Sequence, residues 1–299
     1  MPQTSPMTSN TALSTHDDHV VTLKRDRRMG QLLAYSGVLD PAGIEQVLRH
    51  QRENGGRFGE TAIALGLASE DDIFEALAEQ FEYPYLREAA LFDSELVCAS
   101  DPLGEDAHGF RELRAELVAG AMDRKGERGL AVVSPERGDG RSYVAANLAI
   151  AFAQLGGRTL LIDADLHAPR QHALFRLDDS IGLSQLLAGR AAAESVVQPS
   201  PVTGLLVLGA GPIPPNPAEL LHRGAFEALL REFLARFDYV VLDTPAASEG
   251  TEARIIAAQA GAALVVARPH SARMAALQGL VAAIRKGRAA LAGVVMNEH

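Results

Sequence analysis

Six short apolar runs, separated by stretches long enough to form helices, constrain the fold of this chain more than any other feature. The runs are residues 130–133, 159–162, 205–208, 239–242, 263–267 and 291–296. Each suits a strand buried on both faces, because a half-exposed strand would alternate apolar and polar side chains. The pattern predicts a doubly wound α/β fold with a mainly parallel sheet. Such sheets bind ligands at the carboxyl ends of their strands, so the loops there are expected to carry the chemistry.

The first of these loops leads from an apolar run into a long helical pattern and reads SPERGDGRS, residues 134–142. A glycine-bearing turn that opens a helix presents backbone N–H groups and a positive dipole end to a phosphate. Against the pattern GxxxxGK[ST], the loop has Pro135 for the first glycine and Arg141 for the lysine. The candidate nucleotide-binding residues are Gly138, Asp139, Gly140, Arg141, Ser142 and Tyr143. On its own, the loop could equally be a surface turn before a helix.

Two further strand ends carry acids at the place where the phosphates would lie. Asp163 and Asp165 follow the second apolar run, and Asp243 follows the fourth. Carboxylates at these positions can hold Mg²⁺ directly or through water, and the Ser142 hydroxyl adds another oxygen ligand. The sequence therefore predicts a nucleotide site with Mg²⁺ held by Ser142, Asp163, Asp165 and Asp243.

An internal repeat precedes the apolar runs. Residues 28–51 read RMGQLLAYSGVLDPAGIEQVLRHQ, and residues 57–80 read RFGETAIALGLASEDDIFEALAEQ. The apolar residues near the end of each unit recur at helical spacing, which predicts a short helix, a turn and a longer helix. Asp40 with Pro41, and Ser69 with Asp72, are start signals for the two longer helices.

The repeat resembles the N-terminal domain of type II secretion and pilus-assembly ATPases, a module that in some members binds cyclic di-GMP. The resemblance covers approximately residues 25–90. It implies that a cyclic di-GMP site would be lined by Arg28, Gly30, Gln51, Arg57, Gly59 and Gln80. The alternative is a helical docking module in which the arginines and glutamines are solvated or cap helices.

The rest of the chain follows, in order, the pattern of bacterial tyrosine kinases of exopolysaccharide synthesis. The matching segments are SPERGDGRSYVAANLAIAFAQLG, TLLIDADLHAPR, GLSQLLAG, GLLVLGAGPIPPNPAELL, FDYVVLDTPA and AGVVMNEH. With the repeat included, the chain is similar to the exosortase-associated, chain-length-determinant members of that family. The GPIPPNPAELL segment is the most specific piece, because generic P-loop ATPases of the wider ParA/MinD-like class lack it.

This resemblance implies ATP-dependent phosphorylation of protein tyrosine. It makes Asp163 the candidate to orient or deprotonate the acceptor hydroxyl, with Arg141 beside the reacting phosphates. Asp165 and Asp243 would mainly position Mg²⁺. Asn297, after the last apolar run, would either contact adenine or serve as a turn residue.

The chain departs from the family pattern in three places. Arg141 keeps the charge of the loop lysine, but its planar fork is larger, so nucleotide binding is expected to survive better than turnover. The family's Glu-x-x-Arg-x-x-Arg segment for ring assembly reads His108, Arg111 and Arg114 here, which leaves two arginines for a homo-oligomer contact. No tyrosine follows Tyr239, so phosphorylation of a tyrosine-rich C-terminal tail is not expected.

Composition narrows the partners and the compartment. With 28 Lys and Arg against 38 Asp and Glu, the chain has a net charge of −10, which speaks against nucleic acid as its main partner. The single cysteine, Cys98, cannot form an internal disulfide and fits a reducing compartment. The sequence shows neither a secretory signal nor an apolar run of about 20 residues. We therefore expect a cytoplasmic protein that a membrane chain-length determinant protein recruits to the inner membrane.

The predicted organisation has three parts: a disordered tail (1–24), a helical two-repeat domain (25–95) and a P-loop nucleotide-binding, tyrosine-kinase-like domain (96–299). One functional hypothesis is an ATP-dependent tyrosine kinase or kinase-like regulator that controls exopolysaccharide chain length and export. The other is a non-catalytic switch in which ATP and cyclic di-GMP control docking on the export machinery. A partitioning-type ATPase is disfavoured, because the sequence has neither a basic patch nor a C-terminal amphipathic helix.

Overall fold

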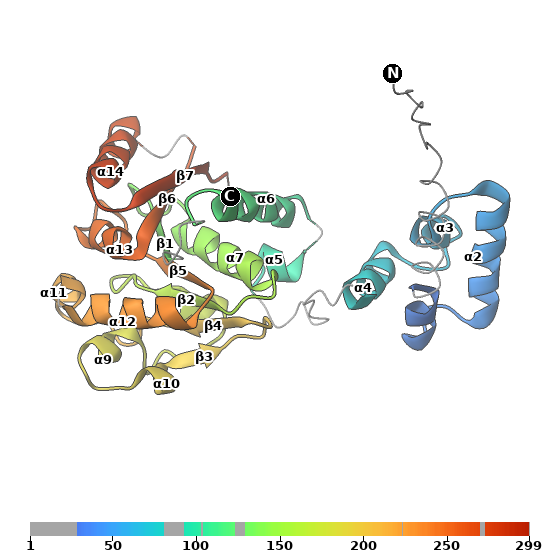
Figure 1. Ribbon diagram of the computed structural model, residues 1–299, viewed down its shortest axis with the longest axis horizontal. Helices are drawn as coiled ribbons and strands as arrows, with labels where there is room; N and C mark the ends of the chain where they lie inside the picture. The colour runs from blue at the N-terminus through green and yellow to red at the C-terminus, as the bar shows by residue number, and fades with distance from the viewer. Residues whose placement is uncertain are drawn as a thin grey trace, which may run out of the picture. The chain divides into compact units, whose positions relative to one another are not determined.

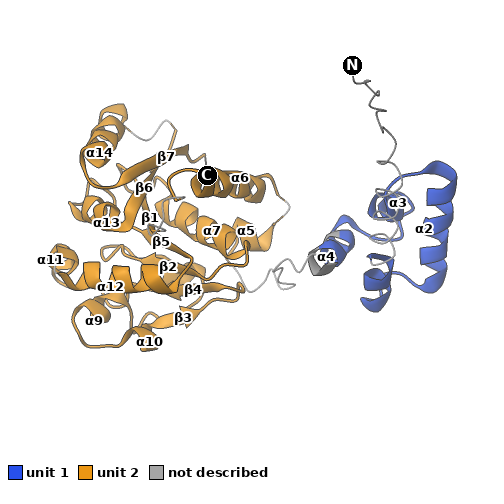
Figure 2. Ribbon diagram, in the orientation of Figure 1, with its two compact units in different colours: residues 1–85 blue, residues 86–299 orange. Residues whose placement is uncertain are grey.

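The chain divides into two compact units, residues 1–85 and residues 86–299 (Figure 2). The computed structural model describes residues 29–80, 93–102, 104–122, 129–222, 224–269 and 273–298. In its described part the first unit is helical, and the second is built around a sheet.

The helices of the first unit follow the two repeats. After a short helix over residues 29–35 come α2 (Pro41–Asn54), α3 (Phe58–Ala64) and α4 (Glu70–Gln80). The predicted order of short helix, turn and longer helix is therefore confirmed in both repeats. Both start signals are confirmed as well: Asp40 Oδ1 accepts the Gly43 N–H (2.7 Å), and Ser69 and Asp72 each accept the other's backbone N–H.

Apolar side chains from both repeats form one core in this unit. Its buried members are Met29, Leu33, Leu39, Val47, Phe58, Ala62, Ile73 and Ala76. Two repeat glycines take part in the packing: a Cβ on Gly30 would lie 3.3 Å from the Phe58 ring, and one on Gly59 would lie 2.7 Å from Ile73 Cγ2. Their lack of a side chain lets the helices approach, so both glycines contribute to the fold of the repeat.

The second unit is built on a seven-stranded sheet in the order β3-β4-β2-β5-β1-β6-β7 (Figure 1). The strands are β1 (Gly129–Val133), β2 (Thr159–Asp163), β3 (Val197–Pro199), β4 (Leu205–Leu208), β5 (Tyr239–Asp243), β6 (Gly261–Ala267) and β7 (Ala290–Met296). Every neighbouring pair is parallel except β3 with β4. The predicted mainly parallel fold and its six strands are confirmed. The short edge strand β3, of sequence VQP, was not predicted, because three residues with a terminal proline give no apolar run.

Helices cover both faces of this sheet (Figure 1). One face carries α5 (Val97–Ser100), α6 (Glu105–Ala119), α7 (Arg141–Ala153) and α8 (Gln171–Leu174). The other carries α9 (Leu183–Leu187), α10 (Ala193–Val196), α11 (Pro217–His222), α12 (Gly224–Arg236), α13 (Glu252–Ala260) and α14 (Met274–Lys286). Strand residues alternate between the two cores: in β1, Leu130 and Val132 face one and Ala131 and Val133 the other.

Helix α7 is buried along nearly its whole length, which explains why its sequence, RSYVAANLAIAFA, is apolar on all sides. Burial on this scale fixes the position of its first turn, where the loop from β1 ends. In the described part of the chain, no helix is both long enough and apolar enough to cross a membrane.

Replacing Gly59 by alanine is expected to destabilise the first unit by about 1–3 kcal/mol, because the added methyl group overlaps Ile73 in a packed core. Thermal unfolding of the full chain, followed by circular dichroism, measures the loss. Gly30→Ala should cost less, since its nearest neighbour is 3.3 Å away, and Gly109→Ala in α6, with nothing within 4 Å, is the matched control. A Gly59→Ala protein as stable as the wild type would contradict this packing.

Candidate active site

The candidate site lies where three adjacent strands end. Strand β5 lies between β1 and β2, and the register places Asp243 beside both Val132 of β1 and Asp163 of β2. Three loops therefore meet at this edge of the sheet: the phosphate loop (residues 134–140), the β2 loop (164–170) and the β5 loop (244–251).

Glycines shape the phosphate loop where it enters α7. Gly138 and Gly140 have φ values of 85° and 94°, a region that favours glycine. A Cβ on Gly140 would also collide with the side-chain amide of Asn297, which donates to the Asp139 carbonyl oxygen (3.2 Å). The Asp139 carboxylate in turn accepts the Glu136 N–H (2.9 Å). Asp139 and Asn297 thus hold the loop in shape, from within it and from the end of β7.

A pocket of about 680 Å³ opens in front of the phosphate loop. This volume lies within the range of roughly 300–1,000 Å³ that is usual for small-molecule sites. Of the predicted site residues, Gly138, Gly140, Arg141, Ser142, Tyr143, Asp165 and Asn297 line it. Asp139, Asp163 and Asp243 are fully buried and are not among the lining residues. The structure therefore separates the predicted site into a pocket wall and a layer of acids behind it.

Sequence reasoning missed several charged residues of this wall. Arg137, Arg170, Arg268 and Glu95 also line the pocket. Arg170 makes a paired contact with Glu95, from Nη2 to Oε1 at 2.7 Å and from Nη1 to Oε2 at 3.3 Å. Arg137 could have been predicted from the sequence, because it lies inside the phosphate loop. The others lie in separate loops, and no spacing rule links them.

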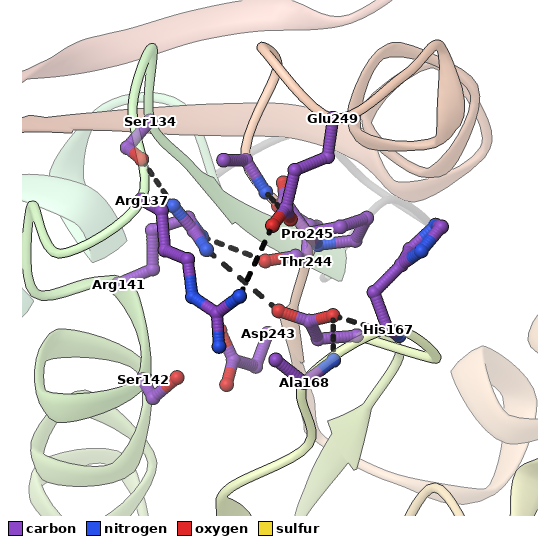
Figure 3. Close-up of polar contacts among 12 residues, drawn as sticks. Ser134, Arg137, Arg141, Ser142, His167, Ala168, Asp243, Thr244, Pro245 and Glu249 are labelled. Carbon is purple, nitrogen blue, oxygen red and sulfur yellow. Dashed lines mark hydrogen bonds and ion pairs between the residues drawn. The ribbon is translucent and has the colours of Figure 1, made fainter. Parts of the chain in front are cut away.

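The Arg141 side chain points into the protein and contacts all three loops (Figure 3). Its Nε donates to the Thr244 carbonyl oxygen (2.7 Å), and its Nη1 donates to the Glu136 carbonyl oxygen (2.9 Å) and to Ser134 Oγ. Its Nη2 lies 3.7 Å from Asp165 Oδ2, and the residue is only 6% exposed. Hydrogen bonds to charged groups contribute about 1.5–3 kcal/mol each. Moving this side chain out to a phosphate would therefore be costly.

Asp163 is fully buried behind the pocket. Its Oδ2 accepts the backbone N–H groups of Arg170 (3.0 Å) and Gln171 (2.9 Å), and its Oδ1 accepts that of Asp165 (3.2 Å). Burial, followed by the nearby charge of Asp243, raises the pKa of Asp163 well above its ordinary value. This carboxyl group shapes the β2 loop, whereas the family resemblance implied that it would orient or deprotonate an acceptor hydroxyl.

Asp165 is the acid of the β2 loop that reaches the pocket wall. Its Oδ1 accepts the N–H groups of His167 (3.0 Å) and Ala168 (2.9 Å), which fixes its orientation. His167 Nε2 lies 3.1 Å from Oε1 of Glu252, a buried residue at the start of α13. This contact, which the sequence did not predict, links the β2 loop to the end of the β5 loop.

Asp243 offers an oxygen atom that fits a metal ion. Its Oδ2 accepts from Gln171 Nε2 (2.8 Å), while its Oδ1 is buried without a hydrogen bond of ordinary geometry. Burial raises the pKa of Asp243, and Arg141 and the Ser142 hydroxyl oppose this rise. Among the described residues no group of three or more His, Cys, Asp or Glu could hold a metal. The oxygens of Ser142, Asp165 and Asp243 are ligands of the kind that Mg²⁺ prefers, and Mg²⁺ in such sites is usually held by one or two carboxylates together with phosphates and water.

The described tyrosines differ sharply in exposure. Tyr143 is 8% exposed and packs edge-on against Phe110 at 5.6 Å, and burial raises its pKa. Tyr239 is stacked on Phe152 at 4.6 Å. Tyr143 is thus buried among its neighbours, whereas Tyr239 is only partly buried in β5. Tyr35, in the first unit, is 90% exposed.

The residues of the predicted cyclic di-GMP site lie in the first unit. Arg28 lies outside the described residues, and of Gln80 only the backbone, in α4, is described. Gln51 Nε2 donates to the Gly56 carbonyl oxygen (3.0 Å), and the Arg57 side chain is 84% exposed, with Glu60 at 4.0 Å.

The two arginines predicted for a homo-oligomer contact lie on α6 of the second unit. Arg111 donates to the Pro102 carbonyl oxygen (2.6 Å), and Arg114 donates to that of Ala151 (2.7 Å). Both guanidinium groups therefore have partners within their own chain.

Without nucleotide or Mg²⁺, the protein is expected to lose stability as pH rises above about 4. Buried Asp163 and Asp243 have raised pKa values, so the folded state keeps protons that the unfolded chain has released. The free energy of unfolding then falls by at most about 1.4 kcal/mol per pH unit for each such proton. Asp243→Asn, which removes one charge and keeps the acceptor for Gln171, should flatten this fall.

Urea unfolding of the full chain between about pH 5 and pH 8 tests this expectation. Glu53→Gln, at an exposed position on α2, is the control and should leave the pH dependence unchanged. An Asp243→Asn protein with the wild-type pH dependence would show that the two acids are not coupled.

Comparison with known proteins agrees with this geometry. The family model ParA, described as the NUBPL iron-transfer P-loop NTPase, matches residues 126–299. The tyrosine-protein kinase YwqD of Bacillus subtilis (strain 168) is 34% identical over 203 residues, which cover 68% of this chain and 85% of YwqD.

Two solved structures are similar to this chain in fold. The chimerical protein CapA2B2 has a TM-score of 0.65 at 30% identity, covering 75% of this chain and 98% of that one. The kinase domain of the Escherichia coli tyrosine kinase ETK also has a TM-score of 0.65, at 28% identity, covering 68% of this chain and 79% of that one. Together with the phosphate loop and its three acids, these similarities show that the chain belongs to the bacterial tyrosine-protein kinase family, with a ParA-type P-loop NTPase domain.

Proposed function

We propose that this protein is an ATP-dependent protein tyrosine kinase that acts in the control of exopolysaccharide chain length and export. One observation carries the proposal: Ser142 at the start of α7 and Asp165 of the β2 loop line the same pocket as Gly138 and Gly140. This wall combines N–H donors for phosphates with oxygen ligands for Mg²⁺. ATP and ADP are the proposed nucleotides.

In the proposed reaction, the phenol oxygen of a tyrosine attacks the γ-phosphorus of ATP. The bond from that phosphorus to the β–γ bridging oxygen breaks, ADP leaves, and the phenol proton passes to a carboxylate. Bound Mg²⁺ would offset the charge that develops on the phosphates. Asp165 faces the pocket and is the carboxylate best placed to receive the proton or hold the metal. Asp163, which the resemblance named for this role, would act through the loop that it holds in place.

A membrane chain-length determinant protein is the proposed partner, and it would recruit this chain to the inner membrane. The GPIPPNPAELL segment and the kinship with tyrosine kinases support this part of the proposal, as does a relative named for a cps region in Klebsiella pneumoniae. A homo-oligomer through Arg111 and Arg114 is also proposed. Its contacts would add to, or replace, the bonds that these arginines make to Pro102 and Ala151.

The kinase proposal is tested with the purified full chain, labelled ATP and Mg²⁺, with phosphotyrosine as the readout. The protein itself and a tyrosine-rich acidic copolymer serve as acceptors. Asp165→Asn is expected to lower the rate by about 100-fold, the usual order for loss of a general base. It should also lower the melting temperature, because buried Arg141 loses the carboxylate that it faces. Asp163→Ala should lower both the rate and the melting temperature, because three backbone N–H groups lose their acceptor. The rates are therefore compared well below the melting temperatures of all variants.

Asp179→Asn is the control for this assay, since its side chain is 69% exposed. A wild-type protein that binds ATP yet labels neither itself, nor the copolymer, nor the cytoplasmic part of a membrane partner would refute the kinase function.

The second candidate function is a non-catalytic switch in which ATP binding controls docking on the export machinery. The hydrogen bonds of Arg141 favour this function. Its guanidinium group donates to the carbonyl oxygens of Thr244 and Glu136, so it is not free to stabilise the phosphoryl group during transfer. ATP binding without phosphotyrosine in the assay above would favour this function.

For the first unit we propose cyclic di-GMP as a ligand, on the strength of the repeat and of the exposed Arg57. Calorimetric titration of the full chain with cyclic di-GMP is expected to show binding that Arg28→Ala plus Arg57→Ala abolishes. The matched control is Arg49→Ala, an equally basic change on exposed α2. If the doubly substituted protein still binds cyclic di-GMP, these arginines do not form the site. If the wild-type protein does not bind cyclic di-GMP, the first unit is better explained as a docking module.

A further inference from the structure

We propose that Arg137, and not Arg141, provides the positive charge that recognises the terminal phosphate of the bound nucleotide, an inference that rests on the proposed ATP site. Arg137 lies in the phosphate loop, lines the same pocket as Ser142 and Asp165, and has a side chain that is 72% exposed. Its side chain points toward Glu249 of the β5 loop (Figure 3). Glu249 therefore acts as a stand-in for the phosphate.

Arg141 is the expected phosphate-binding cation by its position, but its donors are already in use. Three of its N–H groups bond to Thr244, Glu136 and Ser134, and its remaining edge faces Asp165. Drawing it toward a phosphate would leave the carbonyl oxygens of Thr244 and Glu136 without this donor inside the protein. Its charge also offsets that of Asp243. Arg141 is thus a structural cation that stays where it is when nucleotide binds.

The other pocket arginines are less well placed. Arg170 is held by Glu95 through two hydrogen bonds, the geometry of a strong guanidinium–carboxylate pair. Arg268 follows β6, which lies on the far side of β1 from β5 and β2. The acids that would hold Mg²⁺ follow β2 and β5, so the terminal phosphate is expected on that side and Arg268 on the opposite one.

The contact between Arg137 and Glu249 is well suited to being exchanged. Arg137 Nη1 lies 3.8 Å from Glu249 Oε1, too far for a hydrogen bond, and the Arg137 side chain is largely exposed to solvent. A long contact to a solvated arginine of this kind contributes little to stability. Glu249 stays nearby whether or not the pair is made, because its Oε2 accepts the Ala246 N–H (3.2 Å). The β5 loop itself is tied to the phosphate loop, from Ala247 N–H to the Ser134 carbonyl oxygen (2.9 Å). A bound triphosphate carries more negative charge than the Glu249 carboxylate, so Arg137 would leave Glu249 and bind the phosphate.

This exchange predicts how the site distinguishes ATP from ADP. Arg137 would bind the γ-phosphate and so favour the triphosphate, while Glu249 would oppose binding by competing for the same guanidinium group. Substitutions at the two residues should therefore change triphosphate affinity in opposite directions, which a general disturbance of the pocket would not do.

The experiment measures binding of the Mg²⁺ complexes of ADP and of a non-hydrolysable ATP analogue to the full chain by calorimetry. Arg137→Gln is expected to weaken analogue binding about tenfold, as for loss of one charge-assisted contact, and ADP binding by much less. Glu249→Gln, which keeps an oxygen for the Ala246 N–H, should tighten analogue binding. Arg268→Gln is the matched control and should affect both nucleotides equally.

Equal effects of Arg137→Gln on the two nucleotides, or no effect on either, would overturn the inference while leaving the ATP site intact. A wild-type protein that binds neither nucleotide would instead overturn the proposed function. The melting temperature of each variant is measured alongside its titration. Because Arg137 and Glu249 are 3.8 Å apart and make no hydrogen bond to each other, the melting temperatures of their variants are expected to match that of the wild type.

Discussion

A buried positive charge holds the candidate site together. Arg141 places its guanidinium group where the phosphate loop, the β2 loop and the β5 loop meet, and it donates to or faces oxygen atoms of all three. Asp163 and Asp243 lie fully buried at the neighbouring strand ends. Carboxyl groups in such a place need an opposite charge, hydrogen bonds or a shared proton, since an isolated buried charge is strongly unfavourable. The conformation of the three loops depends on this balance.

The same balance explains why the acids have different roles. Asp163 receives three backbone N–H groups and shapes the β2 loop, Asp243 keeps a buried oxygen without a good hydrogen bond, and Asp165 faces the pocket. A bound metal ion would place a positive charge beside this buried oxygen of Asp243. Because the guanidinium group of Arg141 is already bonded within the protein, the chain could bind a nucleotide without transferring its phosphoryl group. This separation underlies the choice between a kinase and a nucleotide-dependent switch.

The repeated residues of the first unit could serve the fold, a ligand site, or both. Gly30 and Gly59 permit the close packing of helices against Phe58 and Ile73, and Gln51 bonds to the segment that joins the two repeats. These roles are sufficient to explain three of the repeated positions through the fold alone. The exposed Arg57 has no such structural explanation, since its contact with Glu60 is long and solvated. A ligand role in this unit therefore depends on its arginines more than on its glycines.

The sequence by itself determined the α/β class, the six main strands, the repeat helices with their caps, and the loops that carry the chemistry. These features are encoded locally, in apolar runs, in helical spacing and in glycines with positive φ. The tertiary structure alone decided which way the side chains of those loops point. It turned Arg141 inward, placed Asp163 behind the pocket, and brought Arg137, Arg170 and Glu95 to its wall. Such choices depend on contacts between residues distant in the chain and on the cost of burying charge, neither of which a local pattern contains.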